Sequence, residues 1–574
     1  MLKVLKNLSV YKWTVAAVFA LIFLQSMADL FLPTLMADII DNGVVVGNIP
    51  YVLKTGAVML LVTAFGALAA VGASYFSART AMGLGRDLRR QIFHHVEGFS
   101  LQEFDKFGTA SLITRTTNDI MQIQRVVMMG MRMVLSAPLM LVGGIIMAVS
   151  KDPQLTLVIL LAMPVLLIFL AIMFSKGMPL FQKVQKKVDR LNLVLRENLT
   201  GVRVIRAFNR EKDEQTRLET ANSELTDISI KVNRLMAFAM PFMMLIMNLT
   251  VVAVIWIGGI RIDGGHLQIG DLMAFIQYVM LIMFALLMAS MMFVMIPRAA
   301  VSARRINEVL ATVPAIADEG TEKADKEQGT LEFDRVSFKY PGAEEPVLSD
   351  ISFKVGPGET LAIIGGTGSG KSTLVNLIPR FYDATEGTIR LNGVDIRRMP
   401  AEEVRQRIGY VPQKAVLFSG TVAENIRFGK EDATDEEVRH AAEIAQAAEF
   451  IEKMKDGYDT FIEQGGTNLS GGQKQRLSIA RALVRRPDVY IFDDSFSALD
   501  FKTDAKLRAA LKKETKDKAV IIVAQRVSTV IDADQIVVLE KGRIAGIGTH
   551  RELLESNDIY REIVKSQMAE ENAS

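Results

Sequence analysis

Residues Gly365–Ser372 read GGTGSGKS, after the apolar stretch Thr360–Ile364 and before the helix-like stretch Thr373–Ile378. This is the strand, loop and helix order of a phosphate-binding loop (P-loop), in which glycines let backbone N–H groups close around phosphate oxygens at a helix N-terminus. Lys371 can reach the β- and γ-phosphates, and Ser372 can ligate Mg²⁺. The stretch therefore predicts a nucleotide and Mg²⁺ site, whose binding positions are Gly365, Thr367, Gly368, Ser369, Gly370, Lys371, Ser372 and Thr373.

Strand-like and helix-like segments alternate around this loop, which indicates an α/β domain. One of them, Val489–Phe492, is an apolar strand that ends in Asp493 and Asp494. An acidic residue at the carboxyl end of a strand beside the P-loop can hold Mg²⁺ through water. Buried strands often end in an acidic residue, however, so this pattern alone does not establish a metal site.

The composition divides the chain into two unlike halves. The 574 residues carry 66 Lys and Arg against 64 Asp and Glu. Residues 1–300 hold 28 basic and 19 acidic residues, whereas residues 301–574 hold 38 and 45. No basic face dominates, so we expect no nucleic-acid partner. Because the chain has no cysteine, disulfides, thiolate metal sites and a cysteine nucleophile are excluded.

The first 300 residues contain six apolar stretches that are long enough to cross a membrane. A helical span needs roughly 20 residues, because the hydrocarbon core is about 30 Å thick and a helix rises about 1.5 Å per residue. The stretches are Trp13–Ala37, Thr55–Ala78, Met133–Val149, Leu155–Phe174, Leu235–Ile260 and Leu272–Pro297. The polar connections at residues 79–134 and 175–234 are expected to be helices that extend out of the membrane.

Basic residues gather on one side of these spans. They precede the first span and follow the second, fourth and sixth, whereas each alternate loop holds at most one basic residue. Lys and Arg collect on the cytoplasmic side of membrane proteins. We therefore expect a multi-pass protein of the cytoplasmic membrane with both termini in the cytoplasm.

A second motif, Leu469–Gln473, reads LSGGQ and is followed by KQR. Together with the P-loop it resembles the signature of the ATP-binding cassette (ABC) superfamily, whose other landmarks occur here in the same order. Tyr340 in FKYPG matches the aromatic residue that stacks on adenine, and Gln413 in YVPQ matches the glutamine that couples Mg²⁺ to the membrane domain. Ser497–Asp500 matches the D-loop, in which we expect Asp500 to assist catalysis. Six spans before the cassette are similar to the exporters of the family, so the resemblance covers the whole chain.

The resemblance implies an α-helical six-span membrane domain of the ABC exporter type, followed by an α/β P-loop ATPase domain. We expect an amphipathic cytoplasmic segment at residues 1–12, the membrane domain at 13–312, a linker at 313–329 and the cassette at 330–574. Short helices near Gly108–Thr117 and Gly201–Phe208 are expected to dock near Gln413, the second of them on a partner's cassette.

The resemblance also implies that two cassettes enclose two ATP molecules, each bound by the P-loop of one cassette and the signature of the other. The signature residues here are Ser470, Gly471, Gly472 and Gln473, whose hydroxyl and N–H groups at a helix N-terminus suit the γ-phosphate. The chain holds one P-loop and one signature. It is therefore predicted to be a half-transporter that works with a second half-transporter.

Two catalytic positions depart from the family pattern. Asp494 stands where the family has glutamate, and Gln525 in VAQRVST stands where it has histidine. Loss of one methylene moves a carboxylate by about 1 Å, which is enough to break contact between a base and its water. Because the signature is intact, the pattern resembles the hydrolytically impaired half of a heterodimeric exporter. The alternative is a homodimer in which aspartate replaces glutamate in a working site.

The resemblance implies ATP-driven export, or flipping, of hydrophobic or amphipathic compounds of the multidrug or lipid class. Twelve of the 30 methionines lie between Met236 and Met295, and a flexible thioether surface suits varied apolar ligands, although methionine is also ordinary lipid-facing filler. Export of a defined lipid or peptide and an ATP-gated channel are the alternatives. Five of the six spans are free of charge, which does not favour a conduction path.

Overall fold

The computed structural model describes residues 3, 6–316, 318–324 and 329–573, in two compact units. The first unit comprises Met1–Glu97 and Ala110–Thr312, and the second comprises Gly98–Thr109 and Val313–Ser574. Residues 1, 2, 4 and 5 of the expected N-terminal segment lie outside the described residues, as do 317 and 325–328 of the expected linker and residue 574.

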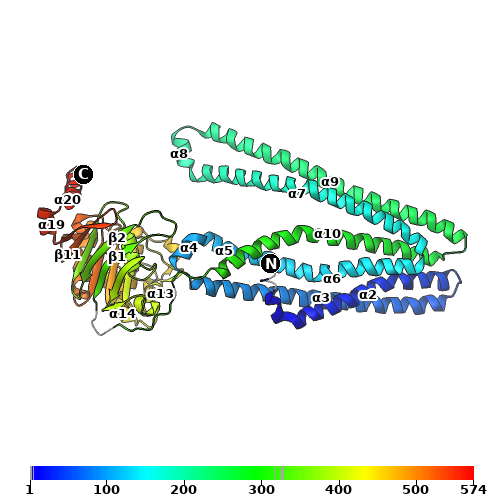
Figure 1. Cartoon of the computed structure of the whole chain (residues 1–574), viewed down its shortest axis with the longest axis horizontal. Coiled ribbons are helices and arrows are strands. Elements are labelled where there is room, and N and C mark those ends of the chain that lie inside the picture. The colour runs from blue at the N-terminus through cyan, green and yellow to red at the C-terminus, as the bar shows by residue number, and fades with distance from the viewer. Residues whose placement is uncertain (1–2, 4–5, 317, 325–328, 574) are drawn as a thin grey trace. The chain divides into compact units, whose positions relative to one another are not determined.

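The first unit consists of long helices (Figure 1). A 3-10 turn, η1 (Asn7–Tyr11), precedes α2 (Lys12–Ile39), which continues as the π-helix η2 (Ile40–Val44). The other long helices are α3 (Ile49–Glu97), α6 (Ile120–Lys151), α7 (Pro153–Thr200), α9 (Glu211–Asp263) and α10 (Ile269–Ala311); the short ones are α5 (Thr109–Thr114), η3 (Arg115–Asp119) and α8 (Val202–Ala207). Among the residues that the structure describes, six helical segments are long and apolar enough to cross a membrane, which confirms the six predicted spans.

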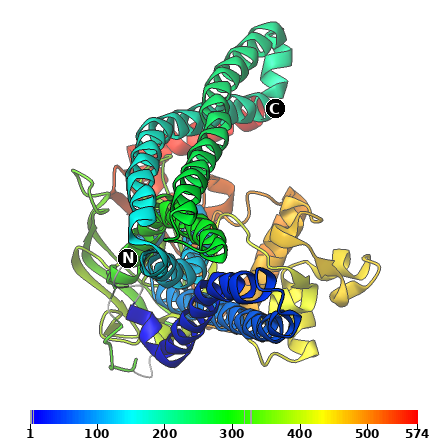
Figure 2. The same cartoon turned by 90° about the vertical axis from the view of Figure 1, so that its right-hand side faces the viewer.

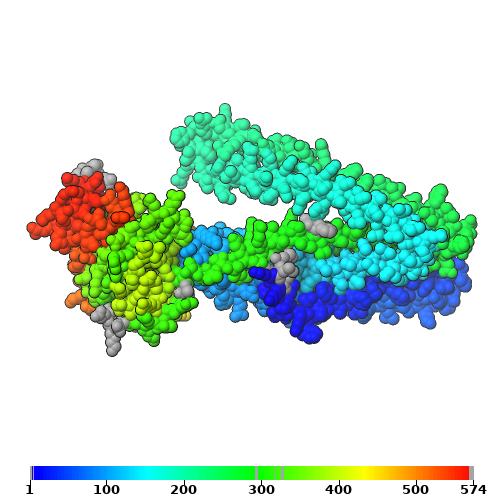
Figure 3. All heavy atoms as spheres, in the orientation of Figure 1, coloured from blue at the N-terminus to red at the C-terminus, as the bar shows by residue number. Residues whose placement is uncertain are grey.

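Two of the long helices form a separate arm. In the first unit α2 packs along α3, α10 along α6 and α7 along α9. The α7–α9 pair diverges from α10 toward the short helix α8, as the ribbons and the space-filling view show (Figure 1, Figure 2, Figure 3). At the other end Asp152 caps the start of α7 by accepting from the Leu155 N–H, and it forms an ion pair with Arg261 of α9.

The described residues of the second unit form three sheets. The six-stranded sheet has the order β12-β11-β3-β10-β9-β6, with β12 antiparallel at one edge and the other strands parallel. Its strands are β3 (Thr360–Ile364), β6 (Ile408–Val411), β9 (Val489–Asp493), β10 (Ala519–Val523), β11 (Gln535–Glu540) and β12 (Arg543–Gly548). The antiparallel sheet has the order β2-β1-β4-β5, from β1 (Leu331–Phe338), β2 (Leu348–Val355), β4 (Glu386–Leu391) and β5 (Val394–Asp395), and β7 (Gly420–Thr421) pairs with β8 (Phe461–Ile462).

Helices pack on these sheets and complete the α/β domain that the alternating strand-like and helix-like segments predicted. They are α11 (Lys371–Leu377), α12 (Ala401–Gln406), α13 (Val422–Arg427), α14 (Asp435–Ile444), α15 (Ala448–Glu452), α16 (Gly471–Leu483), α17 (Phe501–Glu514), α18 (Val527–Val530), α19 (His550–Ser556) and α20 (Asp558–Ala573), with 3-10 turns η4 (Gly457–Asp459) and η5 (Gln464–Gly466). The strands β3, β9 and β10 are almost wholly buried, as expected of parallel strands covered on both faces.

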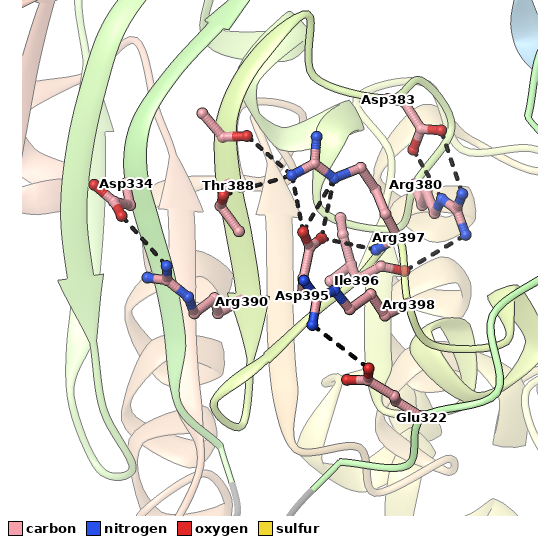
Figure 4. A network of polar contacts seen from close by, with 11 residues as sticks. Glu322, Asp334, Arg380, Asp383, Thr388, Arg390, Asp395, Ile396, Arg397 and Arg398 are labelled. Carbon is pink, nitrogen blue, oxygen red and sulfur yellow. Dashed lines mark hydrogen bonds and ion pairs between the residues drawn. The ribbon is translucent and has the colours of Figure 1, made fainter.

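Ion pairs fasten the antiparallel sheet and the segment that leads into it (Figure 4). Arg397 binds Asp395 at the end of β5, with a shortest N–O distance of 2.8 Å. Glu322, from the segment before β1, donates its N–H to the Arg398 carbonyl at 2.9 Å and lies 3.5 Å from the Arg398 guanidinium. The described part of the expected linker is therefore held against the cassette.

One short helix from the N-terminal half belongs to the second unit. This helix, α4 (Leu101–Phe107), begins with a capping box between Ser100 and Glu103 and ends at Gly108, whose φ is 72°. Its Asp105 accepts a hydrogen bond from the Tyr382 hydroxyl at 2.8 Å. A short helix is present at the expected place, as α5 directly after Gly108, whereas the contact with the cassette comes from α4, which Gly108 ends. The partner of α4 is Tyr382, and docking of the expected helix near Gln413 stays a prediction.

Candidate functional site

The P-loop connects β3 to α11 and is shaped by glycine. Gly370, with φ at 99°, is the N-cap of α11, and a Cβ atom on Gly365 would lie 2.2 Å from the Leu539 carbonyl oxygen. Lys371 donates from Nζ to the carbonyl oxygens of Gly365 and Gly366, at 2.8 Å each. Burial lowers the pKa of Lys371, while the charges of Asp494 and Asp493 act in the opposite direction.

These features fit a bound triphosphate. Lys371 is tied to loop carbonyls, an arrangement that it can exchange for phosphate oxygens. The buried Ser369 hydroxyl has no hydrogen-bond partner among the described residues, and it lies in the same loop. An orphaned donor and a glycine-lined helix N-terminus are both satisfied by an anion.

Asp493 ends β9 beside the start of α11. Its side chain is only 4% exposed, and it accepts a hydrogen bond from the Ser372 hydroxyl. Burial, and then the neighbouring charge of Asp494, raise the pKa of Asp493 to about 6. Two crowded carboxyl groups and a hydroxyl suit a hard divalent cation such as Mg²⁺, so the residues present fit the predicted metal.

The affinity for Mg²⁺ and ATP is expected to depend on Asp493 at mildly acidic pH. Below about 6 this carboxyl group holds a proton that a cation must displace, so affinity should fall about tenfold per pH unit below 6 and level off above it. A fluorescent ATP analogue titrated with Mg²⁺ between pH 5 and 8 measures this. Phosphate groups also titrate near pH 6, so the informative quantity is the difference from Asp493→Asn, and equal profiles for the two proteins would contradict the prediction.

Asp494 receives two side-chain amides on one carboxylate oxygen. Its Oδ2 accepts from Gln413 Nε2 at 3.3 Å and from Gln525 Nε2 at 2.9 Å. Burial raises the pKa of Asp494, partly offset by the Gln413 hydrogen bond. Its backbone N–H donates to the Val523 carbonyl of β10 at 2.9 Å. The structure thus brings together Gln413, which the sequence analysis assigned to Mg²⁺, and the two residues at the expected catalytic positions, Asp494 and Gln525.

Tyr340 lies beside the helix that follows the P-loop. Its hydroxyl is 3.1 Å from the Thr373 hydroxyl, and its ring meets the edge of Tyr382 with centroids 5.4 Å apart. Tyr382 therefore lies between Tyr340 and Asp105 of α4. Sequence reasoning missed Tyr382, because a single aromatic residue after a helix has no distinguishing pattern.

The signature motif forms the beginning of α16. Ser470 is the N-cap and accepts from the Gln473 N–H at 3.3 Å, while the Gln473 side chain accepts from the Ser470 N–H at 2.9 Å. A Cβ atom on Gly472 would lie 3.1 Å from the Ala498 carbonyl oxygen, whereas one on Gly471 would meet nothing within 4 Å. In the part of the chain that the structure describes, no hydrogen bond joins Ser470–Gln473 to the P-loop.

Asp500 caps a helix with its side chain. It is the N-cap of α17, where its Oδ1 accepts from the Thr503 N–H at 2.9 Å, and this hydrogen bonding lowers its pKa. Ser497, earlier in the D-loop, donates to the Asp494 carbonyl oxygen at 2.9 Å. The D-loop therefore contacts Asp494 through Ser497, while the side chain of Asp500 caps the next helix.

Comparison with known proteins matches both halves of the chain. Residues 15–305 match the ABC transporter transmembrane region, and residues 348–497 match the ABC transporter family. An uncharacterized ABC transporter ATP-binding protein of Mycobacterium tuberculosis is 44% identical over 97% of this chain and 96% of its own length. The ATP-dependent lipid A-core flippase of Hahella chejuensis is 33% identical over 87% and 85%.

A solved structure has the same architecture. A bacterial Atm1-family ABC exporter with ATP bound superposes with a TM-score of 0.79 at 26% identity, covering 97% of this chain and 99% of that one. The six spans, the P-loop and signature of the cassette, and the matched relatives all indicate the same protein family. The chain therefore belongs to the ABC transporter family, as an exporter with a transmembrane domain and an ATP-binding domain.

Proposed function

We propose that the chain is one half of a heterodimeric exporter that uses ATP to move, or flip, hydrophobic or amphipathic compounds across the cytoplasmic membrane. Its own P-loop site holds ATP and hydrolyses it slowly. Its signature completes the active site of a different chain. That chain carries the catalytic glutamate and the histidine that the family has at the positions of Asp494 and Gln525. The termini and the cassette lie in the cytoplasm, as the basic flanks of the spans indicate.

The observation that carries this proposal is the geometry around Asp494. The side chain of Asp494 is one methylene shorter than that of glutamate, and its Oδ2 accepts hydrogen bonds from the amides of Gln413 and Gln525. An amide cannot take up a proton, so Gln525 orients and donates but cannot act as a base. The site therefore keeps the groups that bind ATP and Mg²⁺. It lacks a carboxylate long enough to contact the attacking water and a second residue that can exchange a proton.

The other functional residues keep complete binding chemistry. We assign the adenine to Tyr340, the phosphates to Gly365–Thr373 and Mg²⁺ to Ser372, Asp493 and Gln413. Ser470–Gln473 begin a 13-residue helix that can offer its N-terminal donors to a partner's γ-phosphate. This contrast between an intact signature and an altered catalytic pair supports a division of labour between two unlike chains.

The α7–α9 arm supports a partner chain. At its tip, α8 and the residue that caps its C-terminus expose apolar side chains, with Val204 62% and Phe208 71% exposed. Exposed apolar side chains at the tip of this arm, which is flanked by polar sequence, are expected to be covered in the assembly. We assign them to the partner's cassette, as the counterpart of the contact that α4 makes through Asp105 within its own chain.

The substrate class rests on the membrane helices and on relatives. The methionine-rich helices α9 and α10 offer a polarizable surface for apolar ligands. One relative, 33% identical, is a lipid A-core flippase, and another from Bacillus subtilis, 35% identical, is a putative multidrug export protein. We place the membrane domain at residues 13–312, the linker at 313–329 and the cassette at 330–574.

The test compares the chain alone with the chain and its partner. The partner is first captured with the tagged chain from its native membrane, and both preparations are then reconstituted in vesicles. We expect low ATP turnover from the chain alone, and fast turnover with ATP-dependent uptake of amphipathic dyes from the pair. Full turnover by the chain alone would favour a homodimer, and dye movement that only follows the gradient would favour a channel.

A further inference from the structure

The C-terminal helix α20 borders the P-loop. A cavity of about 400 Å³ is lined by Gly366–Ser369 on one side and by α20 on the other, with the end of β11 between them. The α20 residues that line it are Ile559, Glu562, Ile563 and Ser566. The helix is firmly anchored, because Tyr560 is fully buried and packs in one cluster with Val527 and Ile364.

One residue of α20 also holds the segment that carries Gln525. The side chain of Gln567 accepts from the Val527 N–H at 2.7 Å and donates to the Gln525 carbonyl oxygen at 2.6 Å. Val527 is the first residue of the four-residue helix α18, so its N–H has no acceptor within the helix. One amide thus satisfies a donor and an acceptor on either side of Arg526.

The hydrogen bonds of Gln567 are linked, through Gln525, to the candidate catalytic group Asp494. The backbone of Gln525 is held by Gln567, and the side chain of Gln525 donates to Asp494 Oδ2 at 2.9 Å. The segment between β10 and α18 lies outside the sheet, so its backbone N–H and C=O groups must find hydrogen-bond partners elsewhere. A side-chain amide that is 42 residues away supplies one.

We propose that Gln567 is a positioning residue: by clamping the backbone of Gln525 and Val527, it aims the Gln525 amide at Asp494 and makes α20 part of the nucleotide site. This inference rests on the proposed role of Gln525 in ATP turnover. It adds a residue, and a whole helix, that none of the sequence motifs includes. If α20 came away from the sheet, the segment Gln525–Val527, here called the switch segment, would lose its hydrogen bonds to Gln567. ATP hydrolysis would then slow, although every group that binds ATP would still be present.

The first experiment tests the clamp and requires no turnover. Hydrogen exchange is followed in the full-length protein in nanodiscs, in a peptide that covers residues 524–530. Gln567→Ala is expected to speed exchange of the Val527 amide by roughly tenfold, because its hydrogen bond to the side chain is lost. Lys565→Ala, on an exposed position of the same helix, should leave exchange unchanged. Equal exchange in Gln567→Ala and the parent protein would overturn the clamp.

The second experiment tests positioning with a double-mutant cycle. Single-turnover hydrolysis and the ATP dissociation constant are measured for Gln567→Ala, Gln525→Ala and the double variant. We expect Gln567→Ala to slow hydrolysis about fivefold with unchanged ATP affinity, and to add nothing once Gln525 is alanine. Additive losses, or weakened ATP binding, would show a merely structural role and overturn the proposal.

The two proposals fail in different ways. Fast hydrolysis by the parent chain alone would contradict the slow site, but the cycle would still report the coupling between Gln567 and Gln525, because it compares ratios of rates. Conversely, the chain could hydrolyse ATP slowly while the effects of Gln567→Ala and Gln525→Ala add up. That result would reject the positioning role of Gln567 and would not contradict the proposed heterodimer.

Discussion

Replacing Asp494 by glutamate and Gln525 by histidine in the same chain is expected to raise ATP turnover at this chain's own site by about 10²–10⁴-fold. The added methylene extends the carboxylate toward the attacking water, and histidine adds a ring that can exchange a proton. The neighbours needed to hold both groups are present, because Gln413 already reaches the carboxylate and Gln567 holds the backbone at position 525. Single-turnover hydrolysis by the purified pair, with the partner's own site inactivated, measures the gain.

The matched control is Asp494→Asn, which keeps the size of the side chain and removes its charge. In the parent chain this change should have little effect on turnover by the pair, because under the proposed function this site already hydrolyses ATP slowly. If Asp494→Asn instead abolishes turnover by the isolated chain, aspartate is a competent base here and the homodimer is correct. Little gain from the double replacement would place the defect elsewhere in the site.

The second large effect is expected at the signature. Gly471→Asp should lower ATP turnover by the pair at least 100-fold, because it places a carboxylate at the helix N-terminus where the partner's γ-phosphate would bind. The variant should fold normally, since a Cβ atom at this position meets nothing within 4 Å and an acidic side chain suits the first turn of a helix.

Two further variants make this result specific. Gly471→Ala adds the same Cβ atom without charge, so it should cost far less. Lys371→Ala removes the cation of this chain's own P-loop and should leave most of the pair's turnover, because in the proposed heterodimer the fast site uses the partner's P-loop. Thermal unfolding confirms that each variant is folded. Equal losses from Lys371→Ala and Gly471→Asp would contradict an asymmetric pair.

Much of the architecture followed from local sequence. The P-loop needs only consecutive residues between a strand and a helix, and β3 has the bounds that were expected. The six spans depend on uninterrupted apolar length, which is also local. The capping box of Ser470 and Gln473 lies within four residues. Such features are readable because the interacting groups are close along the chain.

The docking helix illustrates the limit of local reading. A docking helix was expected near Gly108–Thr117, but the helix that contacts the cassette, α4, comes earlier in the chain and ends at Gly108. Asp105 and Tyr382 are 277 residues apart, and no periodicity in either segment points to the other. The same is true of Gln567, which lies beyond every family motif and contacts the switch segment only because α20 packs against the sheet.

The sequence by itself determined that this protein is a six-span exporter with one ATP-binding cassette, and that aspartate and glutamine stand where the family has glutamate and histidine. These properties reside in residue identity and short-range order. Only the tertiary structure decided that Gln413 and Gln525 share one oxygen of Asp494 and that Gln567 holds Gln525 in place. The physical reason is that hydrogen bonds act over about 3 Å in space, and folding alone brings distant residues that close.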